Sequence, residues 1–181
     1  RLQADDYPLR VDGLAFLAGG AALLGLRFPM TAAGAPLLIR IDDLARCFSE
    51  NAALTASVAA CLAGAGEPER PAGILAIQSG TGPGAETVEL LTGPLGLPDS
   101  RDALANEYPG SAALPCRHWR LELPRALDPS AALKAELVRE FEERAVESLA
   151  EDPAGHWHYT ISAGGETLLA IAERRVGGPP G

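Results

Sequence analysis

Lysine and aromatic residues are scarce in this sequence. Lys134 is the only lysine among 15 basic residues, and aromatic side chains make up 5% of the 181 residues. Arginine therefore carries almost all of the positive charge, and the acidic residues leave a net charge of −9. Because nucleic acids and anionic membranes bind clustered positive charge, this balance predicts that neither is a partner.

Cysteine is scarce as well. Cys47, Cys61 and Cys116 are an odd number at wide spacings, which is not the pattern of a disulfide framework and favours a reducing compartment. We therefore expect a cytoplasmic protein. The apolar run at residues 14–26 is only 13 residues long, shorter than the ~20 that a membrane-spanning helix needs, so it predicts a core element.

The hydrophobic fraction of 47% is enough for one sizeable core. The length suits a single domain over residues 1–181, with tails at 1–8 and 177–181. Apolar or alternating segments predict strands at residues 9–18, 73–79, 116–123, 156–162 and 167–173. Residues 21–30 are ambiguous, and residues 86–91 fit either one strand of a hairpin or one helical turn.

Apolar residues at steps of four predict helices. An alanine-rich helix is expected over residues 51–66, and another is expected to begin near Asp42. The longest helix is expected to begin at Asp128, as N-cap before Pro129, and to run to about residue 149. Its apolar stripe would consist of Leu133, Leu137, Phe141, Ala145 and Leu149.

Strands that alternate with helices predict an α/β fold. We expect a mixed, mostly parallel sheet with flanking helices and right-handed crossovers between parallel strands. The last two strands, on either side of residues 163–166, form a hairpin that would make the final strand antiparallel.

Two segments resemble a known family. Residues 52–91 contain an alanine-rich helix ending in Ala-Gly, then Pro68-Glu69-Arg70, an apolar strand and the run Ser79-Gly80-Thr81-Gly82-Pro83-Gly84-Ala85-Glu86-Thr87. This resembles the first part of a β-ketoacyl synthase, in which a helix leads into a strand and a G-T-G-x-G-x-E turn. Residues 159–174, with Gly164-Gly165, are similar to the closing hairpin of such enzymes. The resemblance implies one half of a thiolase fold.

The sequence departs from that family where condensation chemistry needs its residues. Cys116 is followed by Arg117-His118-Trp119, which is a strand pattern rather than the sharp turn of a condensing cysteine. His118, His156 and His158 lack the family's surrounding glycines, and the chain is less than half as long as a full synthase. The resemblance therefore implies a shortened, non-condensing protein that acts on or with acyl chains held by an acyl carrier protein.

Cys116, His118, His156 and His158 are the candidate site residues. Cys-x-His and His-x-His on strands each place both side chains on one face. Four such ligands could bind zinc if the two strands were neighbours, but a thiolase-like half separates them, so we expect no metal. Alternatively, Cys116 is a nucleophile with one of the histidines as its base, because a neighbouring histidine can lower a thiol pKa.

Residues 80–85 fit a G-x-G-x-x-A pattern after a strand. A dinucleotide or S-adenosylmethionine loop should open a helix and be followed by an acidic residue on a second strand, and neither is present. We expect a tight turn and no bound cofactor.

Two functions follow from these residues and from the resemblance. One is an enzyme on acyl carrier protein thioesters, for example a double-bond isomerase in which Cys116 adds reversibly to a conjugated enoyl group. The other is a non-catalytic subunit that pairs with itself or with a ketosynthase-like chain. Because thiolase halves bury a large face against another half, we expect an oligomer in both cases.

Overall fold

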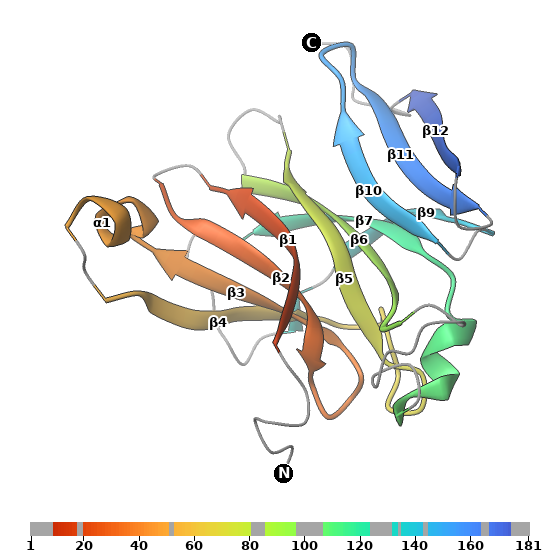
Figure 1. Ribbon diagram of the computed structural model, residues 1–181, viewed down its shortest axis with the longest axis horizontal. Helices are drawn as coiled ribbons and strands as arrows, with labels where there is room; N and C mark the ends of the chain where they lie inside the picture. The colour runs from red at the N-terminus through yellow and green to blue at the C-terminus, as the bar shows by residue number, and fades with distance from the viewer. Residues whose placement is uncertain are drawn as a thin grey trace.

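The protein is built almost entirely of strands (Figure 1). The computed structural model describes residues 9–17, 20–50, 53–80, 86–96, 107–123, 132–133, 135–142, 145–163 and 167–174. The elements in chain order are β1 (Arg10–Phe16), β2 (Ala22–Met30), β3 (Pro36–Asp42), α1 (Leu44–Ser49), β4 (Thr55–Leu62), β5 (Ala72–Ser79), β6 (Glu86–Pro94), the 3₁₀ turn η1 (Pro109–Ala113), β7 (Arg117–Leu123), β8 (Ala132–Leu133), β9 (Ala135–Glu140), β10 (Val146–Glu151), β11 (His156–Ala163) and β12 (Thr167–Arg174).

The strands form three sheets. The five-stranded sheet has the order β1-β2-β3-β4-β8, the four-stranded sheet β5-β6-β7-β9 and the three-stranded sheet β10-β11-β12. Neighbouring strands are antiparallel, except for the short parallel pairing of β4 with β8. Short connections join most neighbours, as antiparallel hairpins allow.

The first core lies between the five-stranded and four-stranded sheets. Strands β1 and β2 lie against β5, and they approach it closely at two glycines. A Cβ on Gly13 would lie 2.6 Å from Ile77 Cγ2, and a Cβ on Gly25 would collide with Ile74 Cγ2. Larger residues at 13 and 25 would therefore force the two sheets apart. Leu23, Leu38, Leu62, Leu90, Trp119 and Leu121 are among the buried members of this core.

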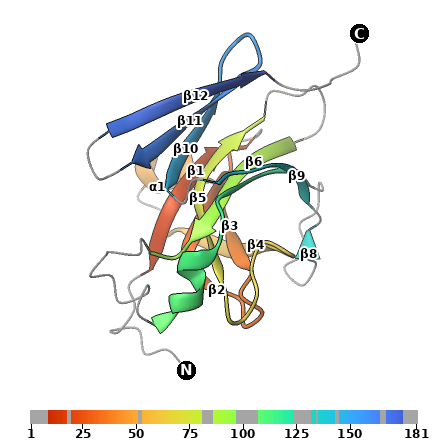
Figure 2. The same ribbon diagram turned by 90° about the vertical axis from the view of Figure 1, so that its right-hand side faces the viewer.

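The second core lies between the four-stranded and three-stranded sheets. Its buried members are Leu75, Leu91, Cys116, Phe141, Val146, Leu149, Trp157, Tyr159 and Ile161. Figure 2 shows β10, β11 and β12 layered across one end of β5 and β6. Strands β5, β6 and β7 therefore contribute side chains to both cores, with alternate residues facing the two sides.

The predicted α/β fold is wrong. Residues 51–66, expected to be helical, contain β4, and the helix expected from Asp128 is replaced by β8, β9 and β10 in its described part. The sheets are antiparallel, so the half-thiolase architecture of a mostly parallel sheet with flanking helices is also wrong. The helix expected near Asp42 is confirmed only as the six residues of α1. No helix in the described ranges is long and apolar enough to span a bilayer.

Several predicted strands are confirmed. They correspond to β1, β5, β7, β11 and β12, and the last two form the expected antiparallel hairpin. Residues 21–30 form β2, and residues 86–91 belong to the hairpin strand β6 rather than to a helical turn. The glycine loop at 81–85, the N-cap position 128 and the two predicted tails lie outside the described residues.

Candidate functional site

His118 lies in a buried polar network between the four-stranded and three-stranded sheets. The alternation of β7 turns Trp119 and Leu121 into the first core and His118 toward the second. The Nε2 atom of His118 is 2.9 Å from Glu89 Oε2 on β6, and its Nδ1 atom is 2.9 Å from the Tyr159 hydroxyl on β11. His118 and Glu89 are fully buried, so this network joins two sheets across a space closed to solvent.

Glu89 is held as a carboxylate by its neighbours. Burial alone would raise the pKa of Glu89, but hydrogen bonds from His118 and Arg120 and the charge of Arg120 outweigh it and lower the pKa. The Arg120 Nε–H group donates to Glu89 Oε1 at 2.7 Å. Oε1 of Glu89 therefore accepts a charge-assisted hydrogen bond from Arg120, and Oε2 accepts a hydrogen bond from His118.

Tyr159 sets the tautomer of His118. Burial raises the pKa of Tyr159 to about 12, an effect that Arg139 opposes and Glu89 reinforces. The tyrosine keeps its O–H group and donates it to Nδ1, so the His118 Nε2–H group donates to Glu89. Both ring nitrogens of His118 are thus engaged, and the ring also packs edge-on against Trp157, with centroids 4.8 Å apart.

Cys116 is buried rather than exposed at the start of β7. It packs in the second core, and its Sγ atom lies 3.9 Å from the Val146 carbonyl oxygen. His118, its predicted base, already uses both ring nitrogens for Glu89 and Tyr159. In this arrangement the thiol is fully buried, and each ring nitrogen of His118 has a partner other than Cys116. The role of Cys116 as a nucleophile stays a prediction.

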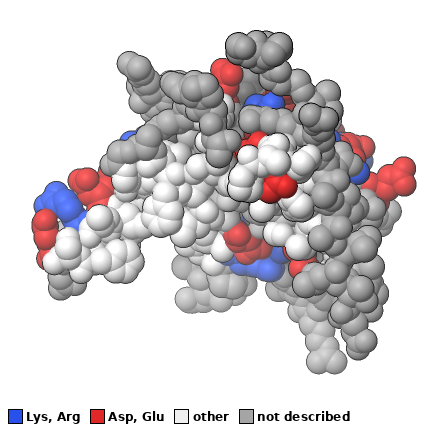
Figure 3. Space-filling model, turned by 90° about the horizontal axis from the view of Figure 1, so that it is seen from above, with Lys and Arg blue, Asp and Glu red and all other residues white. Residues whose placement is uncertain are grey.

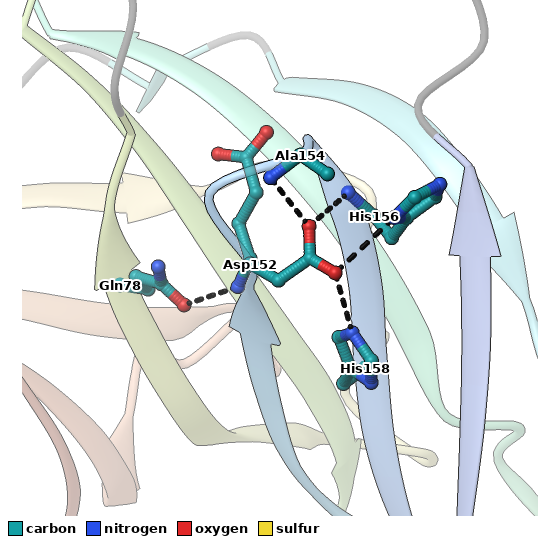
Figure 4. A network of polar contacts seen from close by, with 6 residues as sticks. Gln78, Asp152, Ala154, His156 and His158 are labelled. Carbon is teal, nitrogen blue, oxygen red and sulfur yellow. Dashed lines mark hydrogen bonds and ion pairs between the residues drawn. The ribbon is translucent and has the colours of Figure 1, made fainter.

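His156 and His158 share one face of β11, as their spacing predicted, and both contact Asp152 (Figure 4). Asp152 Oδ2 lies 3.1 Å from His156 Nδ1 and 3.1 Å from His158 Nε2. The other oxygen, Oδ1, accepts the backbone N–H groups of Ala154 and His156, each at 2.9 Å. The carboxylate therefore closes the turn between β10 and β11 on a partly exposed surface.

These hydrogen bonds hold the pKa of Asp152 well below its ordinary value. The largest cause is the backbone N–H of His156, followed by the side chain of His158. The backbone N–H of Glu151, next to this turn, donates to Gln78 Oε1 at 3.2 Å, which attaches the hairpin to β5 (Figure 4).

The four predicted site residues therefore do not form one cluster. Cys116 packs in the second core and His118 contacts Tyr159 in the buried layer. His156 and His158 lie on the other, more exposed face of β11. The four residues therefore do not come together as a set of zinc ligands. Within the described ranges, no group of three or more His, Cys, Asp or Glu side chains is arranged to hold a metal ion.

Four residues of these clusters were not singled out from the sequence. They are Glu89, Arg120, Tyr159 and Asp152. The sequence did contain a sign that Glu89 is buried, because it is the only acidic residue within the apolar run Val88–Leu91. A charged side chain that faces a core needs a buried partner. The sequence contained no such sign of the pairing of Tyr159 with His118, since this pairing depends on how two sheets pack.

No protein-family model, curated protein or solved structure matches this chain. The ketosynthase-like identity, the isomerase activity, the acyl carrier protein partner and the cytoplasmic location therefore stay predictions. The order of helix and strand that suggested the resemblance does not support these predictions, because residues 55–62 form a strand.

Proposed function

We propose that this protein is a non-catalytic pairing subunit that associates with a second copy of itself through the outer face of its five-stranded sheet. The observation that carries the proposal is an apolar row that crosses four strands in register. Its members are Leu14, Leu24, Ile39 and Val58, each paired with the next across β1, β2, β3 and β4. We call these four residues the outer row.

The outer row is open to solvent at both of its ends. The side chains of Leu14 and Val58 are 50% and 38% exposed, and those of Leu24 and Ile39 are partly exposed. Phe16, two residues after Leu14 on the same face, is 61% exposed. A contiguous apolar face of this kind is uncommon on a protein that has no partner.

The charge distribution favours a like partner at this face. Two copies with a net charge of −9 repel each other through their acidic surfaces. An uncharged sheet face avoids that repulsion and is complementary to itself in a two-fold interface. Seen from above, uncharged surface extends from the α1 end toward the middle of the molecule, and charged side chains lie at α1, near the middle of the view and at the margins (Figure 3).

The polar clusters also favour binding over catalysis. The nitrogens of His118 and the oxygens of Glu89 bond to each other and to Tyr159 and Arg120. They therefore stabilise the contact between two sheets, and both His118 and Glu89 are fully buried. A structural role for them is consistent with a subunit whose function is association.

Sedimentation velocity over a micromolar concentration range tests the proposal. Val58→Lys places a charge in the outer row, and Val138→Lys on β9 is its matched control, because both valines are 38% exposed. We expect the wild type and Val138→Lys to dimerise and Val58→Lys to remain monomeric, with unchanged circular dichroism spectra. A monomeric wild type, or dimerisation that Val58→Lys leaves unaffected, would show that the outer row is not the interface.

A further inference from the structure

A cavity opens where the three sheets meet, away from the outer row. Its volume is about 370 Å³, and its walls come from β1, β2, β5, β6 and β10 with the residue that precedes β10. Pockets of roughly 300–1,000 Å³ suit small-molecule ligands, so this one is at the small end of that range. The charged side chains that line it, within the part of the chain that the structure describes, are Asp12, Arg27 and Glu147.

Arg27 is fixed in the wall of this cavity. Its Nε–H group donates to the Pro94 carbonyl oxygen at 3.2 Å, and its Nη1 atom lies 2.9 Å from Asp12 Oδ2. A guanidinium carries five N–H donors in one plane, and these contacts use two of them. The side chain lines the cavity and is 15% exposed. A carboxylate is the acceptor that matches this planar array best.

The charges that line the rest of the cavity do not favour a ligand that is only an anion. Among the described lining residues, Asp12 and Glu147 contribute two negative charges against the one positive charge of Arg27, which leaves a net charge of −1. Because Asp12 is already paired with Arg27, Glu147 is the carboxylate left to attract a cation. A ligand that carries a carboxylate and an ammonium group would satisfy Arg27 and Glu147 together.

Apolar side chains limit what else the ligand can carry. Leu75, Pro94 and Val146 line the same cavity. An aliphatic group against them would remove apolar surface from water, whereas a further charge would be desolvated without a partner. We propose that this cavity binds a free α-amino acid with a small aliphatic side chain, with its carboxylate at Arg27 and its ammonium group at Glu147.

Titration calorimetry with three related probes tests each part of this recognition. L-valine has both charged groups, L-valinamide lacks the carboxylate and 3-methylbutanoate lacks the ammonium group. We expect L-valine to bind, and each of the other two probes to bind at least tenfold more weakly. If L-valine does not bind at millimolar concentration, or if L-valinamide binds equally well, the proposal is wrong.

Two variants locate the site. Glu147 is exposed, so Glu147→Gln should fold normally, weaken L-valine binding about tenfold and leave 3-methylbutanoate binding unchanged or stronger. Glu136→Gln, at an exposed glutamate of β9 outside the cavity, should change neither. L-valine binding that Glu147→Gln leaves intact would overturn the assignment. Val58→Lys should bind L-valine as the wild type does, so this test is independent of self-association.

Discussion

At the scale of single residues, Glu89 is the buried charge of the network that links the four-stranded sheet to Tyr159 of the three-stranded sheet. Its oxygens accept hydrogen bonds from His118 and Arg120, and His118 in turn accepts one from Tyr159. Replacing such a buried group by an apolar one leaves its partners without acceptors, which costs more than the net contribution of the bonds themselves.

We predict that Glu89→Ala lowers the free energy of unfolding by about 3–5 kcal/mol. Glu89→Gln should cost less, because its amide oxygen can accept from Arg120 while its NH₂ group donates to His118 in the other tautomer. Urea denaturation measures both. Glu122→Ala, at an exposed glutamate of β7, is the control and should change stability by no more than about 0.5 kcal/mol. A mild effect of Glu89→Ala would mean that the network does not stabilise the fold.

At the scale of elements, the strands that alternate were predictable, and those with apolar residues at steps of four were not. The alternation of Trp157, Tyr159 and Ile161 against His156 and His158 is confirmed, with the first three buried. Residues four positions apart, however, lie on one face of a helix and also on one face of a strand. The second is true because side chains alternate along a strand with a period of two, and four is a multiple of two. Only the i+3 positions would have separated the two interpretations.

Residues 133–149 show the consequence. Phe141 and Leu149 are buried in the second core, as a helical stripe would also require, but Leu137 is 46% exposed. The described part of this segment forms strands. The high alanine content of residues 51–66 also favoured the wrong prediction of a helix there. Helix propensity is a weak signal, and packing within a sheet overrides it. In the same way, the sequence placed Cys116 and His118 on one face, but it contained no sign that His118 would pair with Tyr159.

The β10–β11 hairpin should depend on pH through Asp152. Its folded-state pKa is depressed, so its stabilising contribution is complete above the ordinary value of 3.8 and is lost as the pH falls through that value toward the folded one. We predict that Asp152→Asn is less stable than the wild type above about pH 5 and that the difference shrinks toward about pH 3.

Urea midpoints at these two pH values measure this effect. The exposed Asp43, which begins α1, provides the control variant Asp43→Asn. Its difference from the wild type should not follow the same course. Equal pH dependence of Asp152→Asn and the wild type would mean that the hydrogen bonds of Asp152 with Ala154, His156 and His158 do not stabilise the hairpin.

At the scale of the whole molecule, the net charge and the outer row act in opposite directions on association. Two copies each carrying −9 repel over the range that salt leaves unscreened, about 10 Å at 0.1 M ionic strength. The apolar contact between two sheet faces is short-ranged and is not weakened by screening. Ionic strength therefore separates an interface made by the outer row from one made by charged side chains.

We predict that raising the NaCl concentration from about 0.05 M to about 0.5 M strengthens self-association, with the dimer Kd falling several-fold. The reason is that screening removes repulsion between the acidic surfaces while the buried contacts of Leu14, Leu24, Ile39 and Val58 persist. Sedimentation equilibrium at both salt concentrations measures the Kd, and Val58→Lys should remain monomeric at each. If added salt instead dissociates the dimer, ion pairs hold the two copies together, and the interface lies on a charged face of the molecule rather than on the five-stranded sheet.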